Sequence, residues 1–415
     1  MKNIILCLIM FVLFIQPFST IFAQPRKELK AAFVRDQDLW IKMGDEEVKV
    51  TQDVNVRYPK WSFDGKWIAY MTSQTEEETN STEEGLWIFH LKSNKRFKIS
   101  SFDHKNFQWA PNQNVLAFQE KNDLKVLDIS LLSHSQNITS DIINYSWLPD
   151  GSGLLTSSKA GNSVYSDIVL TKILIDFKKN EHQSEHLYTI PVKEVDRFYG
   201  TSQFKWSYDH QWIAFLLVPT PSMSTDTNTV SVLSNDGSRF SMIEEMLNYR
   251  AWFQWAPKQN LLGFIQGYNR NVMENKKLEV YMIEQNMSDR YTPKGYVDRD
   301  LTWQDDDNVY VSRSMEMEWT IDVEQRPMPA IYKVHIGTGV SKQVTFPSTK
   351  EGDFRPQYLD DEEKLSWIRT NRSEADVWVA NSEGIEEKIW IENIHVGYWY
   401  YEHWDWDEVF HLYQS

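Results

Sequence analysis

Hydrophobic and polar positions alternate along residues 58–70, YPKWSFDGKWIAY, on both sides of a short polar segment. Pro59 and Trp61 share one side of the first run, because successive side chains of an extended chain point to opposite faces. Asp64 and Gly65 favour a tight turn after this run, and the run that follows alternates in the same way. The stretch therefore predicts a β-hairpin.

The same hairpin pattern returns seven more times along the chain. Each copy carries an aromatic residue at the place of Trp61, which we call the Trp position, and successive Trp positions lie 38 to 59 residues apart. The eight Trp positions are Trp61, Trp109, Trp147, Trp206, Trp255, Trp303, Tyr358 and Trp404. A repeat of this length, built from short strands, predicts a β-propeller.

The register of the repeat supports this interpretation. The third residue after the Trp position is Asp or Asn in seven of the eight copies, and such side chains bond their own turn. The second residue before it is apolar or aromatic in seven of the eight, on the same strand face as the Trp. Both features place the repeats in one all-β domain.

The two ends of the chain predict how the ring closes. Residues 30–53 show strand patterns without a Trp hairpin, and residues 404–413 begin a blade that then stops. Pairing the terminal strands in one blade would remove the exposed sheet edges. The sequence therefore predicts eight four-stranded blades, with seven as the alternative.

The motif W-S-x-D-G-x-x-I-A-Y, residues 61–70, resembles the repeat of TolB-type propellers, which also builds the propeller domain of prolyl-oligopeptidase-like enzymes. The resemblance covers nearly all of the chain after residue 23, and it specifies blade architecture rather than chemistry. It implies an all-β propeller fold and, for TolB itself, binding of periplasmic partners.

Residues 1–23 have the layout of a secretory signal peptide. An apolar run over residues 4–15 follows Lys2, and Ala23 ends a segment broken by polar residues. The run is short for a membrane span, although an uncleaved anchor is the alternative. We expect a signal peptide over 1–23, a propeller domain over 24–415, and a secreted or cell-envelope location without a membrane span after cleavage.

Charge and cysteine content narrow the function. The net charge is −16, which disfavours nucleic acid and anionic membranes as partners. The single cysteine, Cys7, lies in the leader, so the mature chain has no thiol chemistry. We expect a monomer without cofactors.

Catalytic and metal motifs are weak in this sequence. It contains no G-x-S-x-G, no G-x-x-x-x-G-K-[ST] and no H-E-x-x-H, which argues against an enzyme and leaves no catalytic residue to name. His182 and His186 match H-x-x-E-H, but they stand in a polar stretch that predicts a solvated turn instead of the helix a zinc site needs. We therefore expect no metal.

Two groups of residues are candidates for binding. The residues three to five places before each Trp position should ring the mouth of the central channel, where they either hold a ligand or form ion pairs within the ring. The candidates are Arg57, His104, Arg250, Trp252, Asp298, Arg299, Asp300, Arg355, Tyr400 and Tyr401. The second group is the long loop 313–329, where Met315, Met317 and Trp319 alternate with acids and form either an exposed contact surface or core.

These features together predict an exported, non-catalytic propeller that binds a protein or peptide partner at the cell envelope or outside the cell. One alternative is a carbohydrate-binding protein or glycan-active enzyme, in which Trp252, Trp319 and Trp399 stack on sugars. Another is a structural subunit of an envelope assembly.

Overall fold

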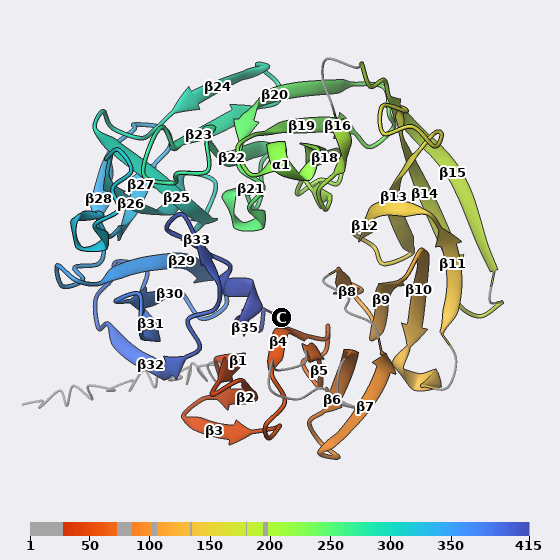
Figure 1. Ribbon diagram of the computed structural model, residues 1–415, viewed down its shortest axis with the longest axis horizontal. Coiled ribbons are helices and arrows are strands. Elements are labelled where there is room, and N and C mark those ends of the chain that lie inside the picture. Colours follow the sequence, from red (N-terminus) through yellow and green to blue (C-terminus); the bar gives the residue numbers. More distant parts are fainter. Residues whose placement is uncertain are drawn as a thin grey trace, which may run out of the picture.

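The protein is a ring of β-sheets arranged around a common axis (Figure 1), as seen in a computed structural model. The structure describes residues 28–72, 85–101, 106–132, 135–179, 181–193 and 198–414. The predicted signal peptide lies outside these residues. Nowhere in the described part of the chain does a helix reach the length and apolar character that a membrane crossing requires.

The described residues form eight antiparallel blades of four strands each, which confirms the eight-bladed prediction. The innermost strands are β4 (Val56–Trp61), β8 (Phe107–Trp109), β12 (Ile142–Trp147), β16 (Phe198–Thr201) with β17 (Lys205–Trp206), β21 (Phe253–Trp255), β25 (Tyr296–Trp303), β29 (Gly352–Leu359) and β35 (Phe410–Leu412). The second strands are β5 (Trp67–Thr72), β9 (Val115–Glu120), β13 (Gly153–Lys159), β18 (Trp212–Pro219), β22 (Leu261–Gln266), β26 (Asn308–Met315), β30 (Lys364–Thr370) and β1 (Lys30–Arg35).

The outer half of each blade is built in the same order. The third strands are β6 (Gly85–His90), β10 (Asp123–Asp128), β14 (Ile168–Asp176), β19 (Asn228–Ser234), β23 (Lys277–Met282), β27 (Ala330–His335), β31 (Ala375–Asn381) and β2 (Asp38–Met43). The outermost strands are β7 (Lys95–Ser100), β11 (Gln136–Ser140), β15 (Glu181–Ile190), β20 (Phe240–Met246), β24 (Met287–Arg290), β28 (Ser341–Gln343), β32 (Lys388–Ile394) and β3 (Glu46–Lys49). The remaining elements are the hairpin β33 (Trp399–Tyr400) and β34 (His403–Trp404), α1 (Pro221–Ser224), η1 (Ile129–Leu131), η2 (Arg250–Trp252), η3 (Val323–Gln325) and η4 (Trp406–Glu408).

The Trp positions join each blade to the one before it. Five indole Nε1–H groups donate to an inner-strand carbonyl of the preceding blade over 2.9–3.2 Å, for example Trp255 to Lys205 and Trp303 to Gln254. Each such bond contributes about 0.5–1.5 kcal/mol net, and its donor would otherwise be buried unpaired. The repeated Trp is therefore a link around the ring as well as a packing residue.

The residue immediately before the Trp position often makes the bond in the other direction. Lys60 Nζ donates to the Phe107 carbonyl over 2.8 Å, and Lys205 Nζ donates to the Phe253 carbonyl over 2.6 Å, each reaching forward to the next blade. In both cases the ammonium also lies 4.2 Å from the centre of that phenyl ring. Adjacent inner strands are thus tied by reciprocal hydrogen bonds.

The closing blade combines both ends of the chain. Strand β35 supplies the innermost strand and β1, β2 and β3 supply the other three, with Phe410 opposite Phe33 and Leu412 opposite Ala31. The largest apolar cluster of the ring surrounds this joint. The predicted closure by terminal strands is therefore confirmed.

The position of the eighth repeat was predicted wrongly. Trp404 does not stand on an inner strand, because β33 and β34 form a separate two-stranded hairpin. By register Leu412 takes the equivalent place, since it pairs with Ala31 of β1 as Trp61 pairs with Ile68 of β5. Tyr413 follows it and links the closing blade to the first one: its ring lies 5.6 Å from that of Trp61, and its hydroxyl donates to the Phe63 carbonyl over 3.0 Å.

Candidate functional site

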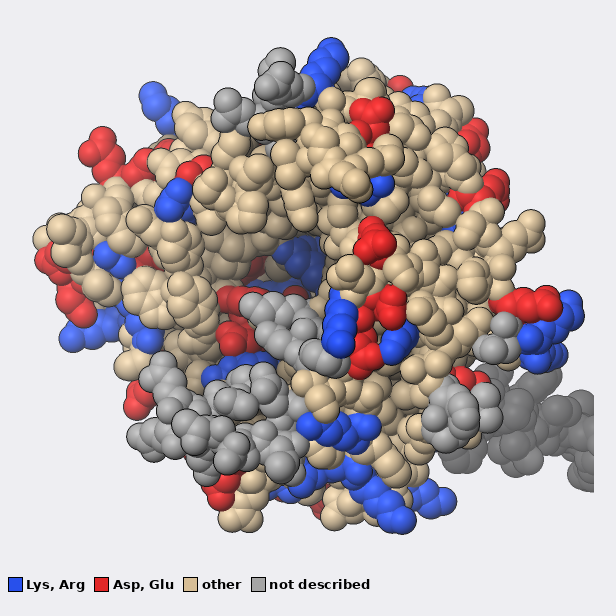
Figure 2. Space-filling model, turned by 45° about the vertical axis from the view of Figure 1, so that its right-hand side comes forward, with Lys and Arg blue, Asp and Glu red and all other residues tan. Residues whose placement is uncertain are grey.

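The channel wall carries a cluster of charged side chains next to the closing blade. Figure 2 shows basic and acidic side chains together inside the hollow at the centre of the ring. We call this group the channel cluster. It consists of Arg57, Tyr58, Lys60, Arg250, Arg355, Asp405, Asp407, Glu408 and His411.

The acidic members come from the turn that leads into β35. Asp407 Oδ1 lies 2.7 Å from an Arg355 guanidinium nitrogen, and Glu408 Oε1 lies 2.8 Å from Arg57 Nε. Asp405 differs, because its only hydrogen bond within the described residues comes from the Tyr58 hydroxyl, over 3.3 Å. The channel thus holds two ion pairs and a carboxylate, Asp405, that makes no ion pair with a described cation, although Lys60 and Arg355 attract it electrostatically.

Two cations of the cluster are also without an ion-pair partner among the described residues. Lys60 donates to a backbone carbonyl, and the exposed Arg250 guanidinium makes no ion pair. Electrostatic interactions connect both side chains to Asp407. The site therefore offers a free carboxylate and free cations within one channel.

Enclosure by the ring changes the ionisation of this cluster. Burial, followed by the charges of Asp407 and Glu408, raises the pKa of Asp405 to about 6. Burial and Arg250 lower the pKa of Lys60 to about 7. Burial would raise the pKa of Asp407, but Arg355 and Arg250 outweigh it and lower that pKa.

The histidine of this cluster is neutral at physiological pH. Burial lowers the pKa of His411 to about 4. Asp405 and Lys60 are therefore the members that change charge between pH 5 and 8.

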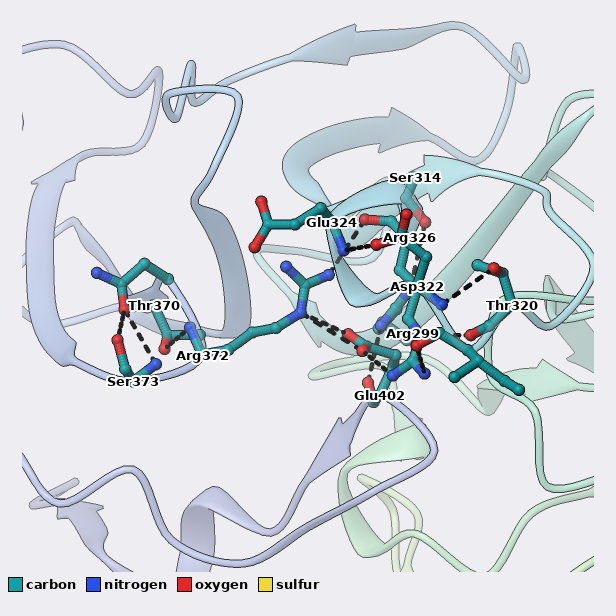
Figure 3. Close-up of polar contacts among 12 residues, drawn as sticks. Arg299, Ser314, Thr320, Asp322, Glu324, Arg326, Thr370, Arg372, Ser373 and Glu402 are labelled. Atoms are coloured by element: carbon teal, nitrogen blue, oxygen red, sulfur yellow. Dashed lines mark hydrogen bonds and ion pairs between the residues drawn. The ribbon is translucent and has the colours of Figure 1, made fainter.

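Beside the cluster, the β33–β34 hairpin lies against blades five to seven, where the blades are numbered in the order in which their innermost strands are given above, from β4 to β35. The His403 ring stacks on Tyr249 with 3.4 Å between centroids, and Tyr400 accepts a hydrogen bond from Arg270 over 2.9 Å. At the tip, Glu402 is buried among Arg299, Arg326 and Arg372, which all point toward it (Figure 3). These contacts hold the hairpin in one position.

A buried lysine shapes the loop that carries Arg270. Lys276 is fully buried, and its Nζ donates to the carbonyls of Tyr268, Asn269, Asn271 and Glu274 over 2.7–3.0 Å. One ammonium thus satisfies backbone oxygens that would otherwise be buried unpaired. Burial lowers the pKa of Lys276 to about 7, and its hydrogen bonds hold this loop, which in turn supports the hairpin.

The predicted channel-mouth residues separate into three groups. Arg57, Arg250 and Arg355 belong to the channel cluster. Tyr400 and Tyr401 lie at the hairpin tip, and His104 lies outside the described residues. The other four are buried within and between blades: Trp252, Asp298, Arg299 and Asp300.

Three of the buried four, Trp252, Asp298 and Asp300, bond to other residues of the ring, whereas Arg299 contacts the hairpin tip. Asp298 accepts two bonds from Arg313, over 2.6 and 2.7 Å, inside blade six. Asp300 accepts from the Trp252 indole over 3.0 Å and from the backbone N–H of Arg355 over 2.9 Å. For these residues, the alternative of contacts within the ring is the one observed.

The predicted contact loop lies partly exposed. Met315 is 64% exposed and ends β26, while Met317 is half-buried. Trp319 is 38% exposed, packs on Tyr401 and lies 3.9 Å below the Arg326 guanidinium. The loop therefore supports the β33–β34 hairpin and also forms part of the surface.

Comparison with solved structures shows similarity to peptidases. Dipeptidyl peptidase 4 of Porphyromonas gingivalis is 10% identical with a TM-score of 0.56, covering 88% of this chain and 58% of that one. Puromycin hydrolase is 8% identical with TM-scores of 0.51 and 0.52 in two structures, covering 83% of this chain and 55% of that one. These matches establish the β-propeller fold. The chain spans little more than half the length of these peptidases.

The structural matches contradict the expectation of a non-catalytic binding protein for a protein or peptide partner at the envelope, because the matches named above are hydrolytic enzymes. The sugar-stacking alternative also loses Trp252, which is fully buried. No family model matches the sequence, and no curated protein matches it either.

Metal and catalytic motifs add little in the described residues. They contain no cluster of His, Cys, Asp or Glu that could hold a metal ion. His182 and His186 lie exposed on strand β15, so the expectation of a turn there was wrong, although the segment is not a helix.

Sequence reasoning missed the polar residue immediately before each Trp position. Every copy has one, and in the seven confirmed copies they are Lys60, Gln108, Ser146, Lys205, Gln254, Thr302 and Gln357. This regularity was visible in the aligned repeats. In five of these copies the side chain bonds a backbone group of the next blade; these residues are Lys60, Gln108, Ser146, Lys205 and Thr302. Lys60 is also one cation of the channel cluster.

Proposed function

We propose that the chain is the propeller of a peptide-hydrolysing system, which takes peptides into its channel and presents them to an associated hydrolase unit. The fold supports this, since the solved structures compared above, a dipeptidyl peptidase and puromycin hydrolase, share it. In this proposal the propeller binds substrate, and the hydrolase unit breaks the amide bond by adding water across it.

The observation that carries the proposal is the unpaired charge of the channel cluster. A free peptide carries an α-ammonium at one end and a carboxylate at the other. Asp405 can accept the ammonium, and Arg250 with Lys60 can bind the carboxylate, because none of the three is used in an ion pair of the described residues.

The test is hydrolysis of fluorogenic peptides by the full-length protein isolated, with its bound partners, from the cells that make it. Arg250→Gln should raise KM about tenfold with little change in kcat, because it removes a binding contact. Lys178→Gln, an equal charge change at an exposed turn, is the matched control. Absence of peptidase activity, or equal kinetics for both variants, would overturn the proposal.

Binding should also depend on pH through Asp405. Its pKa is about 6, so the carboxylate gains charge as the pH rises from 5 to 7. Over that range the α-ammonium of a peptide remains mostly protonated. We expect affinity for a peptide with a free amino terminus to rise several-fold, measured by calorimetry.

Asp405→Asn should remove this rise, because an amide does not titrate. An N-acetylated peptide of the same sequence provides the control, since it lacks the ammonium. The assignment of Asp405 fails if the wild-type pH profile is the same for both peptides.

The resemblance to the TolB family and the location outside the cytoplasm stay predictions. The repeat motif resembles TolB, and residues 1–23 resemble a signal peptide. If both hold, the system handles peptides outside the cytoplasm. Fractionation of cells expressing the chain, with N-terminal sequencing of the product, tests this location.

A further inference from the structure

The tip of the β33–β34 hairpin places a carboxylate among three arginines. Glu402 Oε1 lies 2.9 Å from Arg326, and its two oxygens lie 3.3 and 3.4 Å from Arg372 Nε. Arg299 donates to the Glu402 backbone carbonyl over 2.9 Å. Figure 3 shows these side chains converging on one residue from β25, the 313–329 loop and the loop after β30.

Positive charge exceeds negative charge at this point. Arg326 and Arg372 share the Glu402 carboxylate, Arg299 binds only the Glu402 backbone carbonyl, and Arg299 Nε is buried with no acceptor among the described residues. The nearby acids are engaged elsewhere, Asp298 by Arg313 and Asp300 by Trp252 and the Arg355 backbone. Because unpaired buried cations are costly, this position strongly favours an anion.

The backbone that delivers this anion is strained. Tyr401 and Glu402 have φ values of 50° and 65°, in the left-handed region that side chains other than glycine rarely adopt. Such a conformation carries an energetic cost, and it persists where the surrounding contacts hold it. The arginine contacts offset this cost, so loss of the Glu402 contact would favour release of the hairpin tip.

Glu402 presents the same two groups that the C-terminal end of a peptide presents. These are a carboxylate and a nearby backbone carbonyl, which in a peptide belongs to the residue before the last. We propose that Arg299, Arg326 and Arg372 form a carboxylate-binding site, occupied here by the chain's own Glu402, for which the C-terminal carboxylate of a peptide competes. This inference rests on the proposed function, since it names the chemical feature that the substrate must carry.

A solvent-filled hollow provides an approach to the site. It has a volume of about 370 Å³ and reaches Arg372 from the surface between blades six and seven. Glu324, Lys350 and Asn371 also line it. A peptide end can therefore reach Arg372 while the aromatic contacts of Tyr401 and His403 still hold the hairpin.

The test compares acetyl-trialanine carrying a free carboxylate with its C-terminal amide, by calorimetry on the full-length protein. Glu402→Gln keeps the shape and removes the competing charge. We expect this variant to bind the carboxylate peptide at least tenfold more tightly than the wild type does, with no gain for the amide. The double variant Glu402→Gln/Arg326→Gln should lose the gain.

Equal affinity of wild type and Glu402→Gln for the carboxylate peptide would overturn the inference. If Glu402→Gln does not fold, hydrogen exchange of the wild type replaces it. Saturating carboxylate peptide should then speed exchange of residues 399–404, whereas no difference from the amide would overturn the inference.

The outcome is separable from that of the proposed function. A gain in Glu402→Gln without peptidase activity would overturn the proposed function and leave the carboxylate site in place. If Arg250→Gln weakens hydrolysis but Glu402→Gln shows no gain in carboxylate binding, the proposed function would stand and the carboxylate site would be overturned.

Discussion

Removal of residues 409–415 should prevent the ring from closing and leave the protein unfolded or aggregated. The deletion removes β35, whose backbone pairs with β1 from Ala31 to Phe33. It also removes the buried side chains of Val409, Phe410 and Leu412, each at most 3% exposed. At about 1.5–3 kcal/mol per side chain, this loss is on the order of 5–9 kcal/mol.

That loss is comparable to the whole stability of a typical domain, about 5–15 kcal/mol. The uncovered edge of β1 would in addition offer unpaired backbone groups to other chains. Urea unfolding followed by tryptophan fluorescence, together with size-exclusion chromatography, measures both effects.

The matched control removes residues 414–415 and keeps β35 and Tyr413. We expect its unfolding curve to overlay that of the full chain. A cooperative transition at the full-chain midpoint for the 409–415 deletion would show that the terminal strand does not hold the ring closed.

Seven of the eight blades could be located from sequence because their signal is local. At Trp61 or Trp255, an alternating run, an aromatic residue and a polar turn lie within a dozen residues. The innermost strand of the eighth blade was placed wrongly for a physical reason. Its innermost strand has three residues and its second strand comes from the other end of the chain, so no local hairpin marks it.

The candidate site was less predictable because alternation does not tell which side of an inner strand faces the channel. Asp298 and Arg250 stand at the same distance from their Trp positions, yet the first is buried and the second is exposed. The Glu402 contacts could not be predicted from the sequence, for another reason. They join segments 30 to 103 residues apart, and no repeat encodes them.

Breaking the Asp298–Arg313 ion pair should be the most destabilising single substitution among the charged residues. Both side chains are at most 1% exposed, and Asp298 also accepts a hydrogen bond from Thr292. Arg313→Gln leaves a buried carboxylate without its cation, which typically costs about 3–5 kcal/mol. The free energy of unfolding in urea is the measurement.

An ion pair whose arginine is exposed offers the matched control for this substitution. Arg290 contacts Glu279 over 2.8 Å, also across neighbouring strands, but Arg290 is 55% exposed. Arg290→Gln should cost less than Arg313→Gln, because water screens the exposed Arg290 guanidinium and weakens its attraction for Glu279, whose own side chain is 8% exposed. The contrast isolates burial as the cause, since both variants exchange the same side chains.

Blade seven repeats the buried arrangement and provides an internal replicate. Asp353 and Arg369 face each other across β29 and β30, 2.7 Å apart at their closest atoms, as Asp298 and Arg313 do across β25 and β26. Arg369→Gln should therefore match Arg313→Gln in direction and size.

The double variant Asp298→Asn/Arg313→Gln should recover part of the loss, because it removes the buried charge together with its partner. If Arg313→Gln costs no more than Arg290→Gln, the pair is not a determinant of stability. Its position would then need an explanation other than electrostatics. The shared geometry of blades six and seven makes that outcome a test of both pairs at once.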